Sequence, residues 1–406
     1  MRTAVCAAAI LALSACGGDA DHRDISTTRT VAGDTAVVTI RGPNQLSRTW
    51  TASAVQTEWT PPELRAVRRI ALGAGLIAAT DGRQVVALRR EGGATFPVGV
   101  SGAGPGEYRR AASLAIDSVG QITLVDPGQG RVLQFDAAGR ALTSNQRQLA
   151  SPAHWNIVSI APAHPGSTRD VVAFDRGVIS TDGLEDSMRV VQLLDDGNVH
   201  TLFEVPDGLW AKFGGMNAKR EAYGHRAIVT VDGEDGAAVS TGTDYLIRWW
   251  RPDATLPMLR IEREWRRAAA GQNREPAEEL LDGIGQMGEQ IATVARGQER
   301  GEVKNAIDQL VLVGHGRLLV KVVDSTAQYH PFYLGWFPEL RPPHWTWEVF
   351  DADGELLGQL RLPSAFTPHR LLECQLWGVM EEADGSQSVA RIDLADACAW
   401  VLSARR

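Results

Sequence analysis

Basic and aromatic residues stand side by side at four places in this chain of 406 residues. Arginine binds carboxylates and phosphates through paired hydrogen bonds, and flat rings stack on the faces of ligands. If the fold brings the four groups together, they form a site for an anion; otherwise they are solvated loop residues. The groups are Tyr108 with Arg109 and Arg110, His154 with Trp155, His225 with Arg226, and His369 with Arg370.

Motifs for other chemistry are missing from the sequence. No H-x-x-x-H, C-x-x-C or H-E-x-x-H spacing is present for a metal, and no G-x-S-x-G turn for a serine nucleophile. The segment "DADGE" at 351–355 is similar to the start of a calcium loop, but it lacks the later ligands. We therefore predict no metal, no cofactor and no catalytic residue.

The glycine-rich segment "VGVSGAGPGEYRR" (98–110) has the composition of a phosphate-binding loop without its spacing. That fingerprint requires G-x-G-x-x-G, whereas Gly106 comes one residue early and Glu107 occupies the position of the third glycine. Pro105 also removes a backbone N–H, and Glu107 would repel a phosphate. We predict a corner between strands, in which Glu107 caps nearby N–H groups.

The elements that would position these residues repeat along the chain. A hairpin signature, two alternating strands joined by a turn rich in Asp and Gly, occurs five times, with a weaker sixth copy at the end. A further β run precedes each copy, and a third lies upstream of most, which gives four strands per unit. We therefore predict an all-β fold, a six-bladed β-propeller of four-stranded antiparallel blades. The copies are 86–98, 132–144, 190–202, 247–259, 347–359 and 389–401.

The segments "SGAGPGEYRR", "GQITLVDPGQGRVLQFDAAGR" and "VFDADGELLGQLRLPSAF" resemble the NHL-like six-bladed propellers of bacterial lipoproteins. The resemblance covers roughly residues 60 to 400 at the level of pattern. It implies that the outer strand of one blade runs through the GPGE loop into the inner strand of the next. It also implies a comparison with propeller lactonases and lyases, which work at the channel.

In such a propeller the starts of the inner strands face one end of the central channel. The four basic and aromatic groups precede inferred inner strands. We therefore expect Arg109, His154, His225 and Arg370 to meet at one mouth of the channel, with their neighbours Arg110, Trp155, Arg226 and His369.

One segment interrupts the β pattern between blades 4 and 5. Residues 264–304 contain apolar side chains at intervals of four, three, four and three, which predict a helix. This helix either covers an apolar strip of the propeller or forms a lid over the channel. The stripe consists of Leu280, Ile284, Met287, Ile291 and Val294.

The first residues predict the location. Residues 1–15 combine Arg2 with a short apolar stretch, which is typical of an export signal. Leu13-Ser14-Ala15-Cys16 resembles a lipobox, which implies lipidation of Cys16; the alternative is an ordinary signal peptide. A glycine after Cys16 favours the outer membrane. We expect a flexible tether at 16–35 and the propeller at 36–406.

Two further cysteines lie near the C-terminus. Cys374 and Cys398 form a disulfide in an oxidising compartment, or remain as buried thiols.

We predict a monomeric, membrane-anchored propeller of the cell envelope that binds a protein partner or a small anionic ligand. The alternative is a lactonase-like hydrolase or a lyase that uses the channel mouth. The net charge of −8 argues against a nucleic acid as partner.

Overall fold

The computed structural model describes most of the chain from residue 25 to residue 402. The described residues are 25–52, 54–142, 228–232, 235–242, 244–251, 258–266, 277–283, 285, 306–323, 329, 334 and 337–402, together with five strands between 147 and 206.

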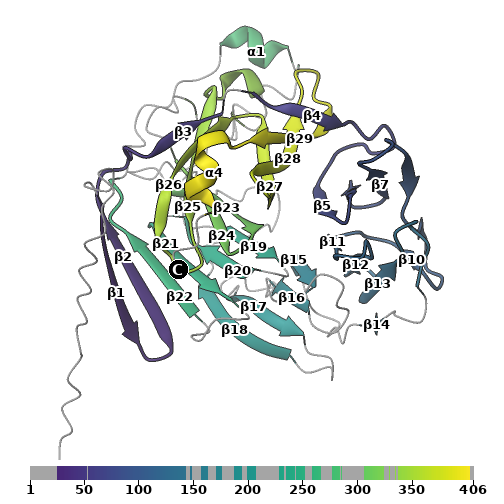
Figure 1. Cartoon of the computed structure of the whole chain (residues 1–406), viewed down its shortest axis with the longest axis horizontal. Coiled ribbons are helices and arrows are strands. Elements are labelled where there is room, and N and C mark those ends of the chain that lie inside the picture. Colours follow the sequence, from purple (N-terminus) through teal and green to yellow (C-terminus); the bar gives the residue numbers. More distant parts are fainter. Residues whose placement is uncertain are drawn as a thin grey trace, which may run out of the picture.

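Six antiparallel sheets stand around a central axis and form a six-bladed β-propeller (Figure 1). In each blade the first strand lies innermost, and the next three follow outward. Blade 1 contains β5 (Arg69–Gly73), β6 (Leu76–Thr80), β7 (Val85–Arg89) and β8 (Thr95–Pro97). Blade 2 contains β11 (Ser113–Ile116), β12 (Ile122–Asp126), β13 (Arg131–Phe135) and β14 (Arg147–Gln148). Blade 3 contains β15 (Ile157–Pro162), β16 (Val171–Asp175), β17 (Ser187–Leu193) and β18 (Val199–Pro206).

Strands from the start of the chain pair with the outer edge of each of the last three blades. Blade 4 contains β19 (Ile228–Asp232), β20 (Gly236–Ser240), β21 (Leu246–Trp250) and β22 (Met258–Arg263). Blade 5 contains β23 (Ile307–Gly314), β24 (Arg317–Val322), β25 (His344–Phe350) and β26 (Leu356–Pro363). Blade 6 contains β27 (Phe366–Leu372), β28 (Gln375–Glu381), β29 (Gln387–Asp393) and β4 (Gln56–Trp59).

The hairpin signatures of the first five copies join the third and fourth strands of blades 1 to 5. In three of these turns, those of blades 1, 2 and 5, a glycine lies in the left-handed region, with φ of +64° at Gly93, +79° at Gly139 and +80° at Gly354. Such angles strain any residue with a Cβ, so the sequence fixes these turns locally. The prediction of the propeller is confirmed.

The sixth copy departs from the prediction. Residues 389–393 belong to β29, but the rest of 389–401 forms η3 (Ala395–Ala397) and α4 (Cys398–Val401) rather than a strand. The fourth strand of blade 6 is instead β4, which pairs antiparallel with β29, Trp59 opposite Val389. Blade 6 is thus closed by residues from the opposite end of the chain.

The residues before β4 run along two further blades. We call residues 26–59 the N-terminal clasp: β2 (Thr35–Arg41) pairs in parallel with β22 of blade 4, and β3 (Thr49–Thr51) with β26 of blade 5. The edge strand β1 (Ser26–Ala32) forms a hairpin with β2. This hairpin starts inside the range 16–35, so the residues that we expected to form a tether are β-structure from Ser26 onward.

A buried polar group holds the clasp against blades 4 and 5. Glu348 accepts hydrogen bonds from the Tyr245 hydroxyl at 2.5 Å and from Gln359 Nε2 at 3.0 Å, and it forms an ion pair with Arg263. Gln359 Nε2 also donates to the carbonyl oxygen of Asn44 at 2.6 Å. Since unpaired buried charges are costly, these contacts fix the path of the clasp.

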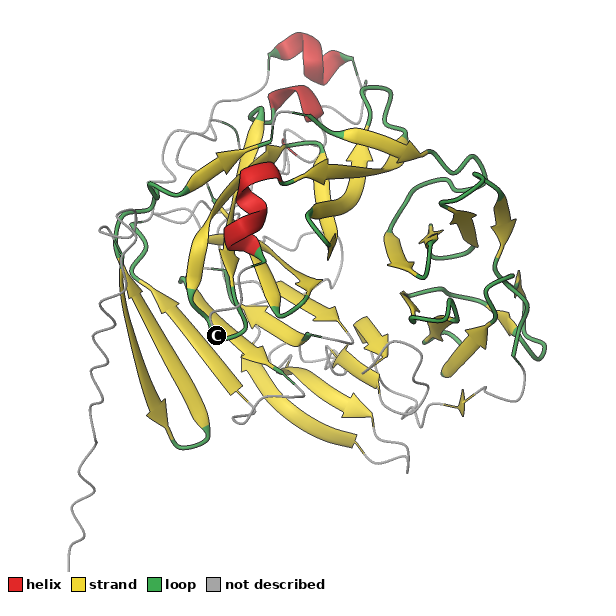
Figure 2. Ribbon diagram, in the orientation of Figure 1, coloured by secondary structure: helices red, strands yellow, loops and turns green. Residues whose placement is uncertain are grey.

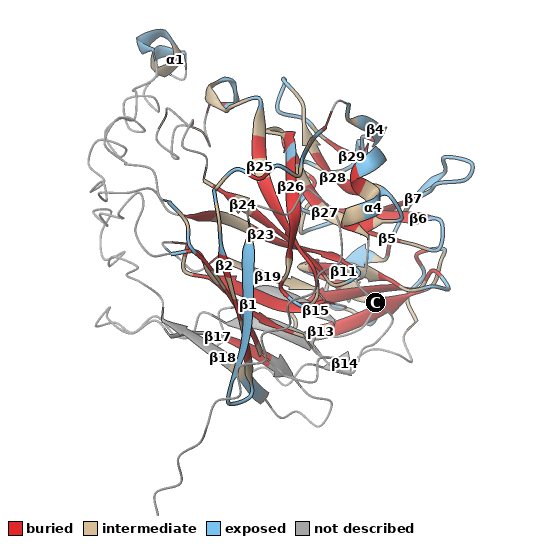
Figure 3. Cartoon of the chain, turned by 60° about the vertical axis from the view of Figure 1, so that its left-hand side comes forward, coloured by how far each residue is buried: buried red, intermediate tan, exposed pale blue. Residues whose placement is uncertain are grey.

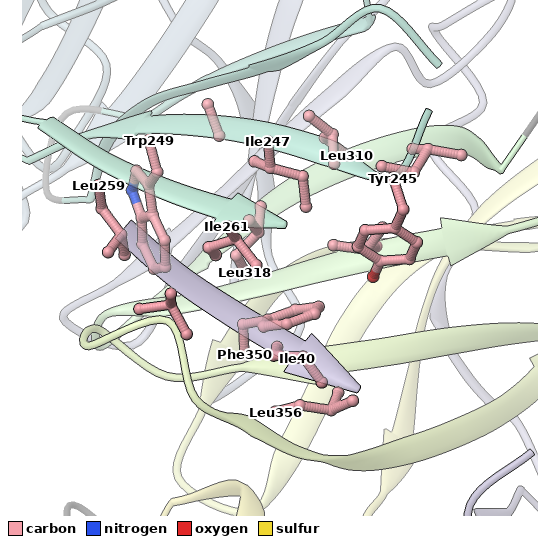
Figure 4. Close-up of a cluster of buried hydrophobic side chains, with 14 of the residues drawn as sticks. Ile40, Tyr245, Ile247, Trp249, Leu259, Ile261, Leu310, Leu318, Phe350 and Leu356 are labelled. Atoms are coloured by element: carbon pink, nitrogen blue, oxygen red, sulfur yellow. The ribbon is translucent and has the colours of Figure 1, made fainter. Parts of the chain in front are cut away.

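Buried apolar side chains form clusters between neighbouring blades, and the buried parts of the strands lie in the middle of the molecule (Figure 3). All five residues of β6 and all five of β12 are buried, because blades cover both faces of these strands. Figure 4 shows the cluster in which blade 4, blade 5 and the clasp meet. It includes Ile40, Trp249, Ile261, Leu318 and Phe350.

The helix of the insertion lies at the edge of the molecule, whereas α4 lies against β26 of blade 5 (Figure 2). α1 (Glu278–Asp282) is the described part of the predicted helical insertion, and its Leu280 and Leu281 pack against Phe337, beside η2 (Pro338–Leu340). The other members of the predicted stripe, Ile284, Met287, Ile291 and Val294, lie outside the described residues. Among the helices that are described, none is long and apolar enough to cross a membrane.

The structure joins Cys374, in the turn between β27 and β28, to Cys398, the first residue of α4, by a disulfide. Their Cα atoms are 5.2 Å apart. Of the two predicted alternatives, the disulfide is therefore the one present. It attaches α4 to blade 6 after the last strand has ended.

Candidate functional site

The inner strands enclose a cavity of about 340 Å³ on the axis of the propeller. β5, β11, β19, β23 and β27 line it, together with a few residues next to these strands. The volume is at the lower end of the range for small-molecule pockets. The polar side chains on its wall are candidates for contacts with a ligand.

Arg69, the first residue of β5, lines this cavity beside His369 of β27. Its guanidinium makes no hydrogen bond or ion pair with another side chain of the described residues. Arg69 is exposed at the start of its strand, and an arginine remains charged at any physiological pH. Blade 1 therefore presents to the cavity a cation that no described side chain pairs.

His369 is neutral in the same cavity. Desolvation by the cavity wall and, second, the charge of Arg69 lower the pKa of His369 to about 3. A neutral imidazole offers one hydrogen-bond donor and one acceptor. His369 thus adds polar contacts to the site without adding charge.

A β-bulge in β27 brings His369 and its neighbour to the same cavity. Pro368 pairs with Gly378 and Arg370 with Trp377, so His369 is the extra residue of the bulge. In a regular strand consecutive side chains point to opposite faces, and a bulge removes this alternation. Both His369 and Arg370 line the cavity.

Arg370 reaches across the end of the neighbouring inner strand. Its Nη1 lies 3.4 Å from Oδ2 of Asp232, the last residue of β19. Gly314, the last residue of β23, lies against the guanidinium of Arg370. A Cβ at this glycine would be 2.8 Å from Cζ of Arg370. The glycine leaves space for the guanidinium, so three blades meet at this ion pair.

The predicted ring of four groups at one mouth is wrong for the members that the structure describes. Inner strands run in the same direction, as the ends of β5 and β11 show: a Cβ at Gly73 would lie 2.9 Å from the carbonyl oxygen of Ile116. Arg109 and Arg110 are exposed and precede the start of β11, whereas Arg370 lies at the end where β19 and β23 finish. The two groups therefore belong to opposite ends of the channel.

The physical reason is the position of each pair in its strand. Arg109 precedes its strand, and its N–H donates to Oδ2 of Asp126 at 2.7 Å. His369 and Arg370 are not at a strand start, because β27 begins at Phe366. The other predicted members, His154, Trp155, His225 and Arg226, lie outside the described residues.

Sequence reasoning missed Arg69, although a signal was present. Arg68 and Arg69 stand next to each other at the start of a strand, as Arg109 and Arg110 do. Both line the cavity.

The GPGE loop is a corner, as predicted. β9 (Val100–Ser101) pairs in parallel with β10 (Glu107–Tyr108), and Oε2 of Glu107 accepts the N–H of Gly104 at 2.7 Å. The Tyr108 hydroxyl accepts the N–H of Val85 at 2.9 Å, which anchors the corner to blade 1. Burial raises the pKa of Tyr108 to about 12. The carboxylate of Glu107 occupies the space that a phosphate would need.

Metal ligands do not gather in the described part of the chain, where no group of three or more His, Cys, Asp or Glu side chains could hold an ion.

No family model matches the chain, and no curated protein matches it in sequence. Solved structures with a similar arrangement include a DUF4221 family member from Bacteroides vulgatus, at 9% identity and a TM-score of 0.47, over 91% of this chain and 98% of that one. A protein from Bacteroides fragilis gives 11% identity and a TM-score of 0.46, over 88% of this chain and 98% of that one. The calcium-binding protein regucalcin from Agrobacterium tumefaciens gives 11% identity and a TM-score of 0.39, over 86% of this chain and 97% of that one. These values are too low to carry an argument about function, so membership of the NHL-like family stays a prediction, and the propeller itself rests on its sheet topology.

Proposed function

We propose that this protein is an envelope-anchored β-propeller that binds a small anionic ligand in its central channel. The observation that carries the proposal is the Arg69 guanidinium on the wall of the channel cavity, which pairs with no side chain among the described residues. The charge of Arg69 attracts an anion into the cavity, and an anion that binds there pairs a cation that no described side chain pairs. Arginine also fits carboxylates and phosphates geometrically.

The proposed anchor is a lipid on Cys16. Nine residues lie between Cys16 and Ser26, where β1 starts. A chain of this length spans at most about 36 Å when fully extended. A lipid at Cys16 would therefore keep the outer edge of blade 4 close to the membrane surface.

Ligand-induced stabilisation tests the binding site. A ligand that binds only the folded protein raises the free energy of unfolding by RT ln(1 + [L]/Kd), about 2.7 kcal/mol at 100 times Kd. We expect phosphate or a simple carboxylate to raise the melting temperature of the wild-type chain, and Arg69→Gln to abolish the rise. Arg140→Gln, which changes an exposed arginine of blade 2, is the matched control and should respond like wild type. An equal rise in Arg69→Gln and wild type would disprove the channel site.

A further inference from the structure

The inner edge of β5 is the part of the cavity wall that adjoins Arg69 along the chain. β5 is the innermost strand of blade 1 and pairs on its outer side with β6 (Figure 1). Among the strands that the structure describes, none pairs with its inner side. An unpaired strand edge presents backbone N–H and C=O groups, here to the channel.

The side chains of β5 point to the neighbouring blades rather than to the channel. Ile70 and Leu72 belong to the buried cluster between blades 1 and 6, and Ala71 to the cluster between blades 1 and 2. All three residues nevertheless line the cavity. They therefore contribute their backbone to its wall.

The turn after β5 fixes the hydrogen-bonding pattern of this strand. Ala74 and Gly75 have φ of +45° and +73°, as the two central residues of a type I′ hairpin turn do. Gly73 and Leu76 flank this turn and lie opposite each other. In such a hairpin the flanking residues exchange hydrogen bonds, so Gly73 directs its peptide groups to β6.

Hydrogen-bonded pairs alternate along two antiparallel strands. Two and four residues before the turn-flanking glycine, Ala71 and Arg69 therefore also direct their backbone groups to β6. The residues between them, Ile70 and Leu72, direct N–H and C=O to the other side. The channel thus has donors and acceptors at every second residue of β5, in the spacing that an extended peptide matches.

We propose that the ligand of the channel is a short peptide with a free C-terminal carboxylate, which pairs as an additional strand with the inner edge of β5. The inference rests on the proposed function, because Arg69 binds the carboxylate. Since Arg69 is the first residue of β5, a peptide that ends there runs antiparallel to the strand. Addition of a strand to a sheet edge and capture of a terminal carboxylate are both known modes of peptide recognition.

Four small probes separate the carboxylate from the peptide groups. They are N-acetyl-trialanine, its C-terminal amide, propionate, and an N-acetyl-trialanine analogue with an ester oxygen in place of the N–H of the middle alanine. When the last alanine lies opposite Arg69, the middle one lies opposite Ile70. The ester then removes a donor to the carbonyl oxygen of Ile70 and hardly changes the shape of the ligand.

Isothermal titration calorimetry of the full chain compares these probes. N-acetyl-trialanine should bind about tenfold more tightly than its amide or propionate, and about threefold more tightly than the ester, as the loss of charged and neutral hydrogen bonds predicts. Arg69→Gln should reduce the affinity of the acid to that of the amide. Arg140→Gln, at an exposed arginine of blade 2, should keep the wild-type ratios.

Amide hydrogen exchange measured by NMR reports the strand pairing itself. The N–H groups of Ile70 and Leu72 should exchange more slowly when N-acetyl-trialanine is bound, and not when propionate is bound. Ala71 is the matched control, because its N–H is directed to β6 with or without the ligand.

The outcomes separate the peptide from the anion site on which it depends. Propionate that binds as tightly as N-acetyl-trialanine, or exchange at Ile70 and Leu72 that the peptide leaves unchanged, would overturn the peptide and leave the anion site in place. Equal affinity of the acid and its amide for the wild-type chain would overturn the role of Arg69. Failure of all four probes to bind would overturn the anion site as well.

Discussion

His369 has consequences for stability because it is half-buried beside a cation. Its pKa in the folded protein is about 3, whereas a histidine in an unfolded chain titrates near 6.5. Between these values the unfolded chain binds the additional proton, so stability rises with pH in this window and gains nothing from this group above it.

We expect acidification from pH 7 to pH 4 to destabilise the wild-type protein more than His369→Gln. The upper limit for one group is about 1.4 kcal/mol per pH unit. Thermal unfolding of both proteins at several pH values measures the difference, and a difference that stays constant from pH 7 to pH 4 contradicts the assignment. Glutamine retains a donor and an acceptor, so the comparison isolates the titration.

The elements show which parts of the molecule could be predicted from the sequence. Each blade hairpin carries its own signal, such as Gly93 or Gly354 at a turn, and neighbouring strands pair locally. β4 and β29 have no such signal: Glu58 and Arg391, which form an ion pair at 2.6 Å, are 333 residues apart in the chain. The alternating pattern at 389–401 suggested a local partner, but the clasp supplied one from a distance.

The candidate site could be predicted only in kind. Arginine and histidine next to strands predicted a basic site at the channel, and the structure places Arg69, His369 and Arg370 on the wall of the channel cavity. Which of them face the cavity depends on where each strand begins and on the bulge at His369, and neither follows from residue types. For this reason Arg69 was missed, and Arg109 was assigned to the same end as Arg370.

The disulfide provides a test at the scale of elements. Cys374 and Cys398 are 24 residues apart, and their bond attaches α4 to the inner hairpin of blade 6. Removing a disulfide that closes a loop of this size lowers the free energy of unfolding by on the order of 3 kcal/mol in the chain-entropy model. We expect Cys374→Ser to lower the free energy of unfolding by such an amount, measured by denaturant titration.

Cys398→Ser and the double serine variant are the controls for this measurement. Both should match Cys374→Ser, because each breaks the same bond. A double variant that is clearly less stable than either single variant would show that the thiols stabilise the fold in another way.

At the scale of the whole molecule, the proposed lipid anchor would determine where the propeller works. We expect Cys16→Ser to move the protein from the membrane fraction to the soluble fraction, or to leave the signal uncleaved. Fractionation of cells followed by mass spectrometry of the N-terminus distinguishes these results. A cleaved, unlipidated protein that still sediments with membranes would exclude a lipid anchor.

The N-terminal clasp also makes closure of the propeller depend on the synthesis of strands late in the chain. The clasp is synthesised before the strands with which it pairs. Its partners lie at residues 258–263, 359–361 and 389–391. Contacts between such distant segments form late, after the chain between them has been ordered. A ribosome product that stops before residue 387 leaves β4 without a partner and the ring open. Such a fragment exposes strand edges to proteases and chaperones. The ring can close only in a chain that already contains β29.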